Sequence, residues 1–312
     1  MEERDFLVRI SWMYYIEDMS QQEIADYFGL SRVKITRLLQ KARNEGIVSV
    51  QINDKLTKII ELEDKVRKKF GLKQAFITPS PKDEKDIFKF LGKGIADFLS
   101  LVLKHNIILG IGWGRTINAA IPFLNQLKKF NNVRIIALTG GQFTKANVPN
   151  PIEIIYTFGR ILGGECYYPL IPALLPDSKT KESLTSKDYH GEWYDFIDKT
   201  DVAIAGIGVV TPDANLFQQY DEGPQDAVEL MNKGAVGDIV NEFFDINGNL
   251  VKHEISRRIF TIGVGRLKRI PISVGVAGGK EKIKPILGAL RGHFINTLIT
   301  DENTALELLK TE

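Results

Sequence analysis

The spacing of apolar residues along the chain changes near residue 71. Before that point, apolar residues recur three or four positions apart, which predicts helices with one buried face. After it, short apolar runs alternate with longer amphipathic segments. Such alternation predicts an α/β domain, doubly wound, with a mostly parallel sheet covered by helices. The expected organisation is a small all-α domain over residues 1–54 and a large domain over residues 55–312.

The large domain is expected to contain several strands and helices in alternation. The strands are the short apolar runs at residues 75–78, 107–111, 133–138, 202–207, 272–277 and 295–299. The helices are the amphipathic segments at residues 86–103, 151–162, 188–199, 225–232, 280–291 and 302–310. Residues 176–187, rich in Ser, Thr and Lys, are expected to be the least ordered stretch.

Residues 20–43 carry the signals of two short helices joined by a tight turn. Ser20 and Glu23 fit a capping box at the start of the first helix. Gly29 suits the left-handed backbone at its end, and Ser31 is a candidate N-cap for the second helix. This is the arrangement of a helix-turn-helix, whose second helix meets base edges in the DNA major groove.

Positive charge is concentrated on that second helix. Residues 31–43 hold five basic residues and no acid, whereas residues 1–50 hold seven basic and eight acidic ones. The predicted DNA-binding residues are Arg32, Val33, Lys34, Thr36, Arg37 and Lys41. Lys41 is better placed for phosphates than for bases. The alternative, a solvated hairpin with a basic face, is disfavoured by the small and buried residues at helix-turn-helix spacing.

Two segments connect this hairpin to the large domain. After Gly46, residues 47–52 alternate as a short strand, so the domain is expected to be a winged helix-turn-helix with a reduced wing. Residues 55–70 have an apolar stripe and predict a connecting helix. That helix either mediates dimerisation or packs on its own domain, and the two readings are about equally good.

Glycine clusters follow the ends of the predicted strands, at residues 110–114, 140–141, 206–208 and 278–279. Ligands of open α/β sheets bind at these strand ends, where glycines let backbone amides approach an anion. Gly112, Trp113, Gly114, Arg115 and Thr116 open a predicted helix and form the first candidate for a phosphate cradle. The cluster is neither a P-loop nor a dinucleotide fingerprint, because the required lysine and glycine spacings are absent.

Two charged residues lie in similar contexts. Asp238, between glycines and an apolar run, is a candidate acceptor for sugar hydroxyls, and a turn cap is the alternative. Lys282 follows Gly278 and Gly279 in the first turn of a helix, where a phosphate or hydroxyl partner would explain its charge, and a surface lysine is the alternative. No catalytic residue or metal site is predicted. The four histidines lack ligand spacing, and the single cysteine, Cys166, lies in an apolar run.

Composition adds constraints on class and location. The chain has 312 residues, 44% hydrophobic and 26% charged, with a net charge of +2. A single cysteine excludes a disulfide framework. The N-terminus lacks the basic start and apolar segment of a signal peptide, and no apolar run is long enough for a membrane span. The sequence therefore predicts a cytoplasmic protein with no membrane partner.

Taken together, the motifs resemble the SorC-type sugar-binding transcriptional regulators. The resemblance covers essentially the whole chain and starts with the helix-turn-helix. The further motifs are GIGWGRT (110–116), LTGG (138–141), DVAIAGIG (201–208), GAVGDI (234–239), VAGG (276–279) with Lys282, ALRG (289–292) and LITDE (298–302). Each motif is short, but the ordered set is specific. The segment at residues 142–150 matches no pattern that we can assign.

The resemblance implies a large domain folded like sugar-phosphate isomerases and deaminases. It implies control of an operon for carbohydrate catabolism, with DNA affinity or oligomeric state set by a phosphorylated sugar and with no cofactor. It also implies double-stranded operator DNA as partner and a homodimer or homotetramer. The family's effector contacts carry over to Gly112, Trp113, Gly114, Arg115, Thr116, Gly140, Gly141, Asp238 and Lys282.

Two other functions remain open from sequence. The chain could be a sugar-phosphate isomerase or deaminase with an accessory N-terminal domain, which requires a general acid–base group in the pocket. Asp238 could serve, but no histidine lies in the glycine motifs. The chain could also be an interaction module whose pocket binds nothing.

Overall fold

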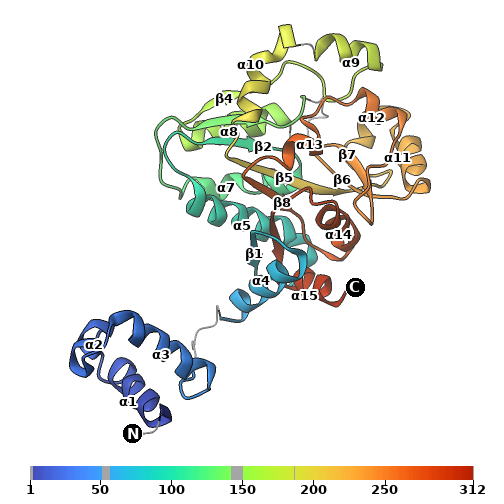
Figure 1. Ribbon diagram of the computed structural model, residues 1–312. Helices are drawn as coiled ribbons and strands as arrows, with labels where there is room; N and C mark the ends of the chain where they lie inside the picture. The colour runs from blue at the N-terminus through green and yellow to red at the C-terminus, as the bar shows by residue number, and fades with distance from the viewer. Residues whose placement is uncertain (1–2, 51–56, 142–149, 186, 312) are drawn as a thin grey trace. The chain divides into compact units, whose positions relative to one another are not determined.

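The computed structural model describes residues 3–50, 57–141, 150–185 and 187–311. The chain divides into two compact units, Met1–Thr57 and Lys58–Glu312. The fold class expected from sequence is confirmed, since an N-terminal helical unit is followed by an α/β unit with a mostly parallel sheet. Figure 1 labels the elements used below.

The first unit consists of α1 (Glu3–Tyr15), α2 (Gln21–Phe28) and α3 (Arg32–Asn44). The predicted capping box is present, with Ser20 accepting from the backbone N–H of Glu23 and the Glu23 carboxylate accepting from that of Ser20. Gly29 ends α2 at φ 62°, and Ser31 caps α3. The helix-turn-helix geometry is therefore set by local signals that the sequence carries.

Two features of this unit differ from expectation. Helix α1 was not predicted, yet its Leu7 and Ile10 are buried in the same core as Ile24 and Ile35. The strand predicted over residues 47–52 is wrong for residues 47–50, which form a bend and irregular backbone. Residues 51 and 52 lie outside the described residues.

Helix α4 (Thr57–Phe70) packs on the large unit through its apolar stripe. Leu62 and Val66 are buried in the core of that unit. The Glu63 carboxylate accepts the backbone N–H of Ile77 at 2.9 Å, and the Lys69 ammonium donates to the carbonyl of Leu309 at 2.9 Å. The sequence left open whether this connecting helix mediates dimerisation or packs on its own domain. These contacts support packing on its own domain.

The described part of the large unit contains one nine-stranded sheet. Its main path runs β1-β9-β8-β5-β2-β3-β4, with every neighbouring pair parallel. The strands of this path are β1 (Gln74–Thr78), β2 (Ile108–Ile111), β3 (Arg134–Ala137), β4 (Glu165–Tyr167), β5 (Val202–Val209), β8 (Ile272–Val276) and β9 (Thr297–Asp301). A short antiparallel hairpin, β6 (Ala235–Ile239) and β7 (Glu242–Asp245), joins through β5.

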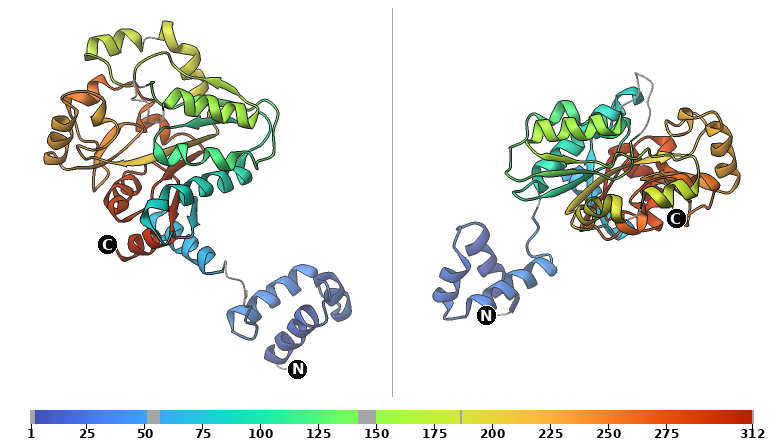
Figure 2. Two further views of the ribbon diagram at one scale, coloured as in Figure 1. Left: turned by 180° about the vertical axis from the view of Figure 1, so that it is seen from behind. Right: turned by 90° about the horizontal axis from the view of Figure 1, so that it is seen from above.

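Helices cover both faces of the sheet, as Figure 2 shows. One face carries α5 (Ile87–Val102), α6 (Arg115–Asn118), α7 (Ile121–Leu124) and α8 (Pro151–Leu162). The other carries α4, α10 (Lys187–Asp198), α13 (Gly263–Leu267), α14 (Ile283–Arg291) and α15 (Glu302–Lys310). Successive residues of a strand point to opposite faces of the sheet. Ile204 is buried in the apolar core beneath α5 and α8, and Ala205 is buried in the core beneath α4 and α14. The apolar runs of the sequence are thus buried on both sides.

A side lobe extends from β5, and of its elements the sequence predicted only the helix at residues 225–232. It contains α11 (Gly223–Asn232), the hairpin and α12 (Glu254–Arg258), and it has its own apolar cluster around Phe217 and Phe243. Helix α9 (Ser178–Leu184) lies in the stretch expected to be least ordered, so that prediction is wrong there. Asp177 caps α9 by accepting the backbone N–H of Thr180 at 2.8 Å, a local signal visible in the sequence.

Candidate functional site

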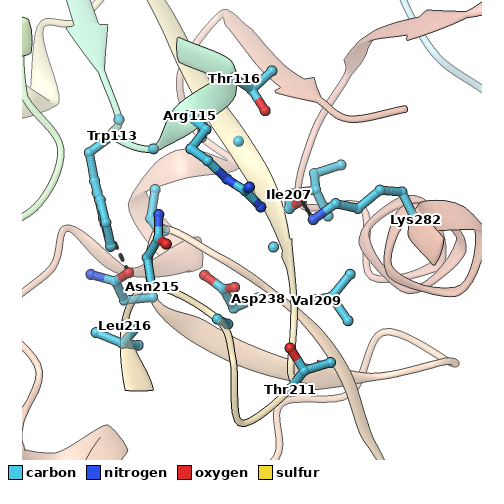
Figure 3. Close-up of a pocket in the computed structure, with 18 of the residues that line it drawn as sticks. Trp113, Arg115, Thr116, Ile207, Val209, Thr211, Asn215, Leu216, Asp238 and Lys282 are labelled. Carbon is cyan, nitrogen blue, oxygen red and sulfur yellow. Dashed lines mark hydrogen bonds between the residues drawn. The ribbon is translucent and has the colours of Figure 1, made fainter. Parts of the chain in front are cut away.

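A cavity of about 410 Å³ lies at the carboxyl ends of β2 and β5, between the sheet and the side lobe. Its volume falls in the range typical of small-molecule sites. The wall is formed by the turn after β2, the far half of β5, the hairpin and the short turn at Lys280–Lys282 that precedes α14 (Figure 3). The lining residues used below are Phe88, Gly112, Trp113, Gly114, Arg115, Thr116, Thr139, Gly206, Ile207, Gly208, Thr211, Asp213, Asn215, Asp238, Val240, Asn241 and Lys282.

Two cations share one end of this cavity. The guanidinium of Arg115 and the ammonium of Lys282 point into it from different elements (Figure 3). Arg115 is held against the Phe88 ring, 4.7 Å from its centroid, and Lys282 donates to the carbonyl of Ile207 at 3.1 Å. Burial lowers the pKa of Lys282, the charges of Asp238 and Glu281 raise it, and the charge of Arg115 has a smaller lowering effect. A bound anion would compensate the charges of both Arg115 and Lys282, so this end of the cavity is suited to a negatively charged group.

Asp238 faces the same space from the hairpin. It lies opposite Gly208 in the antiparallel pairing of β5 and β6. Burial raises the pKa of Asp238 to about 6, against the opposing effects of the Lys282 charge and a hydrogen bond from the backbone N–H of Asn241. The carboxylate is therefore a strong acceptor whose charge is only partly compensated. Such a group suits the hydroxyls of a polar ligand.

The hairpin turn leaves one donor without a partner. Val240 and Asn241 occupy the turn with φ values of 47° and 61°, a conformation that is strained for a β-branched residue. The indole N–H of Trp113 donates to Oδ1 of Asn241 at 3.3 Å, which orients the amide. Its Nδ2 is buried without a hydrogen-bond partner in the described chain. A buried, unpaired amide in a cavity wall is costly unless a ligand accepts from it.

Most predicted effector residues lie together in this cavity. Gly112, Trp113, Gly114, Arg115 and Thr116 line it, as do Asp238 and Lys282. The turn opens α6 as expected, but α6 has a single turn, so the case for an anion rests on the side-chain cations.

Gly140 and Gly141 were also predicted as effector contacts, and they are not among the residues that line the cavity. A Cβ on Gly140 would lie 2.6 Å from the carbonyl oxygen of Ile171, so close backbone packing accounts for this glycine. Gly141 forms a bridge with Pro172. The neighbouring Thr139 lines the cavity instead.

Several lining residues were missed from sequence. Phe88, Thr211, Asp213, Asn215 and Asn241 reach the cavity from α5, the loop after β5 and the hairpin. Of these, Asn241 alone had a readable signal. A two-residue turn between short strands favours Asn, which tolerates positive φ.

The predicted DNA-binding residues lie on α3. Arg32, Val33, Lys34, Thr36 and Arg37 are exposed, while Ile35 between them is buried. The Thr36 hydroxyl already donates to the side chain of Gln21 at 2.7 Å. Lys41 is paired with Glu3 and lies 3.7 Å from a carboxylate oxygen of Glu45. The exposed basic face is therefore concentrated in the first half of α3.

One group of possible metal ligands was not visible from spacing. Atoms of Asp226, Glu229 and His253 lie within 4.8 Å of one another. The Nδ1 atom of His253 accepts the backbone N–H of Ile255 at 3.3 Å, so Nε2 carries the proton and donates to Glu229 at 3.0 Å. This histidine caps α12, and hydrogen bonding explains its environment.

None of the helices in the described ranges is long and apolar enough to cross a membrane.

Comparison with known proteins agrees with this architecture. A family model described as "Putative sugar-binding domain" matches residues 54–310, and a "Crp-like helix-turn-helix domain" matches residues 6–65. The sorbitol operon regulator of Klebsiella pneumoniae is 32% identical, over 97% of both chains. The transcriptional regulator LsrR of Escherichia coli K12 is 33% identical over all of this chain and 96% of the relative.

Solved structures give the same result. The crystal structure of the full-length sorbitol operon regulator SorC from K. pneumoniae has a TM-score of 0.74 and 31% identity, covering 99% of this chain and 100% of that one. These relatives are named as regulators, not as enzymes, which disfavours the isomerase or deaminase reading. The chain belongs to the SorC family of sugar-binding transcriptional regulators, with a helix-turn-helix followed by a sugar-binding domain.

Proposed function

We propose that this regulator controls a carbohydrate catabolic operon and that a phosphorylated sugar is its effector. The observation that carries the proposal is the cavity with two cations at one end, Arg115 and Lys282, and Asp238 facing the same space. A phosphate suits the cations, and sugar hydroxyls suit the carboxylate and the unpaired amide of Asn241. Neither a neutral sugar nor inorganic phosphate would use both sets of groups.

The output of the regulator would be DNA binding by α3. In this proposal Arg32, Val33, Thr36 and Arg37 face base edges, and Lys34 and Lys41 contact phosphates. The units serving these roles would be residues 1–54 for DNA and residues 55–312 for the effector. The protein would act in the cytoplasm as a dimer or tetramer, as the reading of two half-sites requires.

The effector would act by linkage. A ligand that binds two DNA-binding geometries with different affinity shifts their populations by that difference. The experiment is a mobility-shift titration on the DNA upstream of the protein's own gene, with a panel of sugar phosphates, the matching free sugars and inorganic phosphate. A thermal-shift measurement runs in parallel, because a ligand at about 100 times its Kd stabilises the folded state by about 2.7 kcal/mol.

Paired lysine variants sharpen this test. Lys282→Met removes a cation of the cavity, whereas Lys284→Met removes an exposed lysine that does not line it. We expect a sugar phosphate to raise Tm and change DNA affinity in the parent and in Lys284→Met, and to lose both effects in Lys282→Met. If no sugar phosphate raises Tm, the proposed ligand class is wrong. If one raises Tm without changing DNA affinity, the ligand binds but the gating proposal is wrong.

A further inference from the structure

A buried carboxylate lies at the end of β9, behind the wall of the cavity. Asp301 is 2% exposed and is not among the residues that line the cavity. No ion pair recorded within the described ranges involves it. Burial of a charged group is costly unless hydrogen bonds compensate it. The hydrogen-bond partners of Asp301 therefore indicate what this buried charge does.

One oxygen of this carboxylate stabilises the start of α15. Oδ1 of Asp301 accepts the backbone N–H of Thr304 at 3.2 Å, as an N-cap does, and it accepts the Ser80 hydroxyl at 2.7 Å. The oxygen of that hydroxyl accepts the backbone N–H of Asn303 at 2.8 Å. These contacts are sufficient for a helix cap, and they do not involve the second oxygen.

The second oxygen contacts the loop that follows β8. Oδ2 of Asp301 accepts the hydroxyl of Thr304 and lies 3.3 Å from the backbone nitrogen of Gly279. The hydroxyl oxygen of Thr304 accepts the N–H of Gly279 at 2.7 Å. A Cβ on Gly278 would lie 2.5 Å from Oδ2, so a larger residue would block this approach. Asp301 and Thr304 thus hold the loop together, at a single N–H group.

The carbonyl of the same glycine leads to the cavity. The carbonyl oxygen of Gly279 accepts the backbone N–H of Lys282 at 3.0 Å and closes the short turn at Lys280–Lys282. The φ of Gly279 is 100°, a backbone conformation that favours glycine. From this turn the Lys282 ammonium reaches the carbonyl of Ile207 in the cavity wall (Figure 3). One glycine therefore connects the buried pair to a cation of the cavity.

We propose that Asp301 and Thr304 are positioning residues of the ligand cavity, which hold the N–H of Gly279 and so fix the turn that directs Lys282 at the ligand. A lysine side chain loses rotamer freedom when it binds an anion, and a turn fixed beforehand reduces the further loss on binding. The inference rests on the proposed binding of a phosphorylated sugar. The contacts that it invokes are nevertheless present without ligand.

Variants of two buried threonines separate positioning from general stability. Thr304→Val keeps the shape of the side chain and removes the hydroxyl that accepts from Gly279, and Thr304→Ser restores a hydroxyl. Thr300→Val is the matched control, because Thr300 is also fully buried and its Oγ1 has no hydrogen-bond partner in the described chain. Asp301→Asn gives a second route, since it keeps an oxygen for the cap and replaces the other oxygen by a donor.

Mass spectrometry of the full-length chain tests the contact without ligand. Hydrogen exchange over residues 277–282 should be faster in Thr304→Val and Asp301→Asn than in the parent, Thr304→Ser and Thr300→Val. The pH dependence of acetylation at Lys282 reports its pKa, which burial holds below the usual value in the parent. This pKa should rise toward about 10.4 when the turn is released. Exchange and pKa that match the parent in both Thr304→Val and Asp301→Asn overturn the proposal.

Isothermal titration with the sugar phosphate found in the panel tests the consequence for binding. Thr304→Val should weaken binding about twofold to tenfold, as expected for one lost hydrogen bond, and Thr304→Ser and Thr300→Val should bind like the parent. An unchanged Kd in Thr304→Val, or an equal loss in Thr300→Val, overturns the positioning role. If no sugar phosphate binds the parent, the proposed effector class is wrong, and hydrogen exchange and acetylation still decide whether the pair fixes Lys282.

Discussion

Gly208 and Asp238 lie directly opposite each other where β5 meets β6, and a Cβ on Gly208 would lie 1.8 Å from Oδ1 of Asp238. The glycine thus provides the space that the carboxylate occupies. Gly206, two residues earlier on the same strand, has among the described residues only the carbonyl oxygen of Trp113 near its missing Cβ, at 3.7 Å. Two glycines that look alike in the sequence therefore have different structural roles.

Gly208→Ala should displace the carboxylate of Asp238 and so weaken ligand binding in the cavity. Overpacking of this kind costs about 1–3 kcal/mol, so Tm should fall and the thermal shift with a sugar phosphate should be lost. Gly206→Ala is the matched control and should keep both. Calorimetry and thermal-shift titration provide the measurements. Equal behaviour of the two variants would show that Asp238 does not need the space at Gly208.

Removing the side chain of Asn241 should weaken effector binding without unfolding the protein. Asn241→Gly keeps the positive φ of the turn and deletes the unpaired amide. Loss of one hydrogen bond of about 0.5–1.5 kcal/mol weakens binding about twofold to tenfold. Isothermal titration with the active sugar phosphate measures the change. An unchanged Kd would mean that the amide does not contact the ligand.

Effector binding should change the fluorescence of Trp113, which lines the cavity. The other tryptophans, Trp12 and Trp193, do not line it. The signal should therefore disappear in Trp113→Phe. Persistence of the full signal in that variant would place the ligand elsewhere.

Stability should depend on pH through Asp238. Its pKa is raised from 3.8 to about 6 in the folded state, so between about pH 4 and pH 6 the folded protein holds a proton that the unfolded chain has released. Stability contributed by this protonated group is present at low pH and falls as pH rises from about 4 to about 6, on the order of 3 kcal/mol in all. Asp238→Asn should flatten this decline, as measured by denaturant titration at several pH values. A parallel decline in both proteins would assign it to other groups.

Glu3 should compete with DNA for Lys41. The hydrogen bond with Glu3 raises the pKa of Lys41 and holds its ammonium at the surface of its own unit. Glu3→Gln should strengthen DNA binding about twofold at low salt and steepen the salt dependence by about 0.9 log units if Lys41 then reaches a phosphate. Asp5→Asn removes the same charge from α1 and is the control. If both variants change DNA binding equally, the cause is the loss of one negative charge and not the freeing of the Lys41 ammonium from Glu3.

The sequence predicted those parts of the fold that rest on local signals. The capping box at Ser20 and the C-cap at Gly29 are read from adjacent residues, and the parallel strands are continuous apolar runs. The hairpin was missed because its short strands contain Ala, Gly and Asp in place of a continuous apolar run. Helix α1 was missed because its exposed face is itself apolar, which obscures the helical period.

The residues of the cavity also differ in whether local sequence signals reveal them. Arg115 and Asp238 were identified because glycine clusters mark strand ends. Asn241 was not identified, because its amide is oriented by a hydrogen bond from Trp113, which lies 128 positions away in the sequence. Residue spacing does not reveal a contact of this kind. Gly140 looked like a ligand-binding glycine but is explained by close backbone packing.

The contact between Glu63 and Ile77 has a consequence for association in solution. Within the described residues, β1 pairs with β9 alone, so its other side would present free N–H and C=O groups to another strand. The Glu63 carboxylate accepts a hydrogen bond from one of these N–H groups, that of Ile77, and the apolar side chains of α4 pack on the core of the same unit. Helix α4 therefore also shields this edge of the sheet. A shortened chain that begins after Phe70 would expose that edge, and it would aggregate through strand addition even though every residue of the cavity was still present.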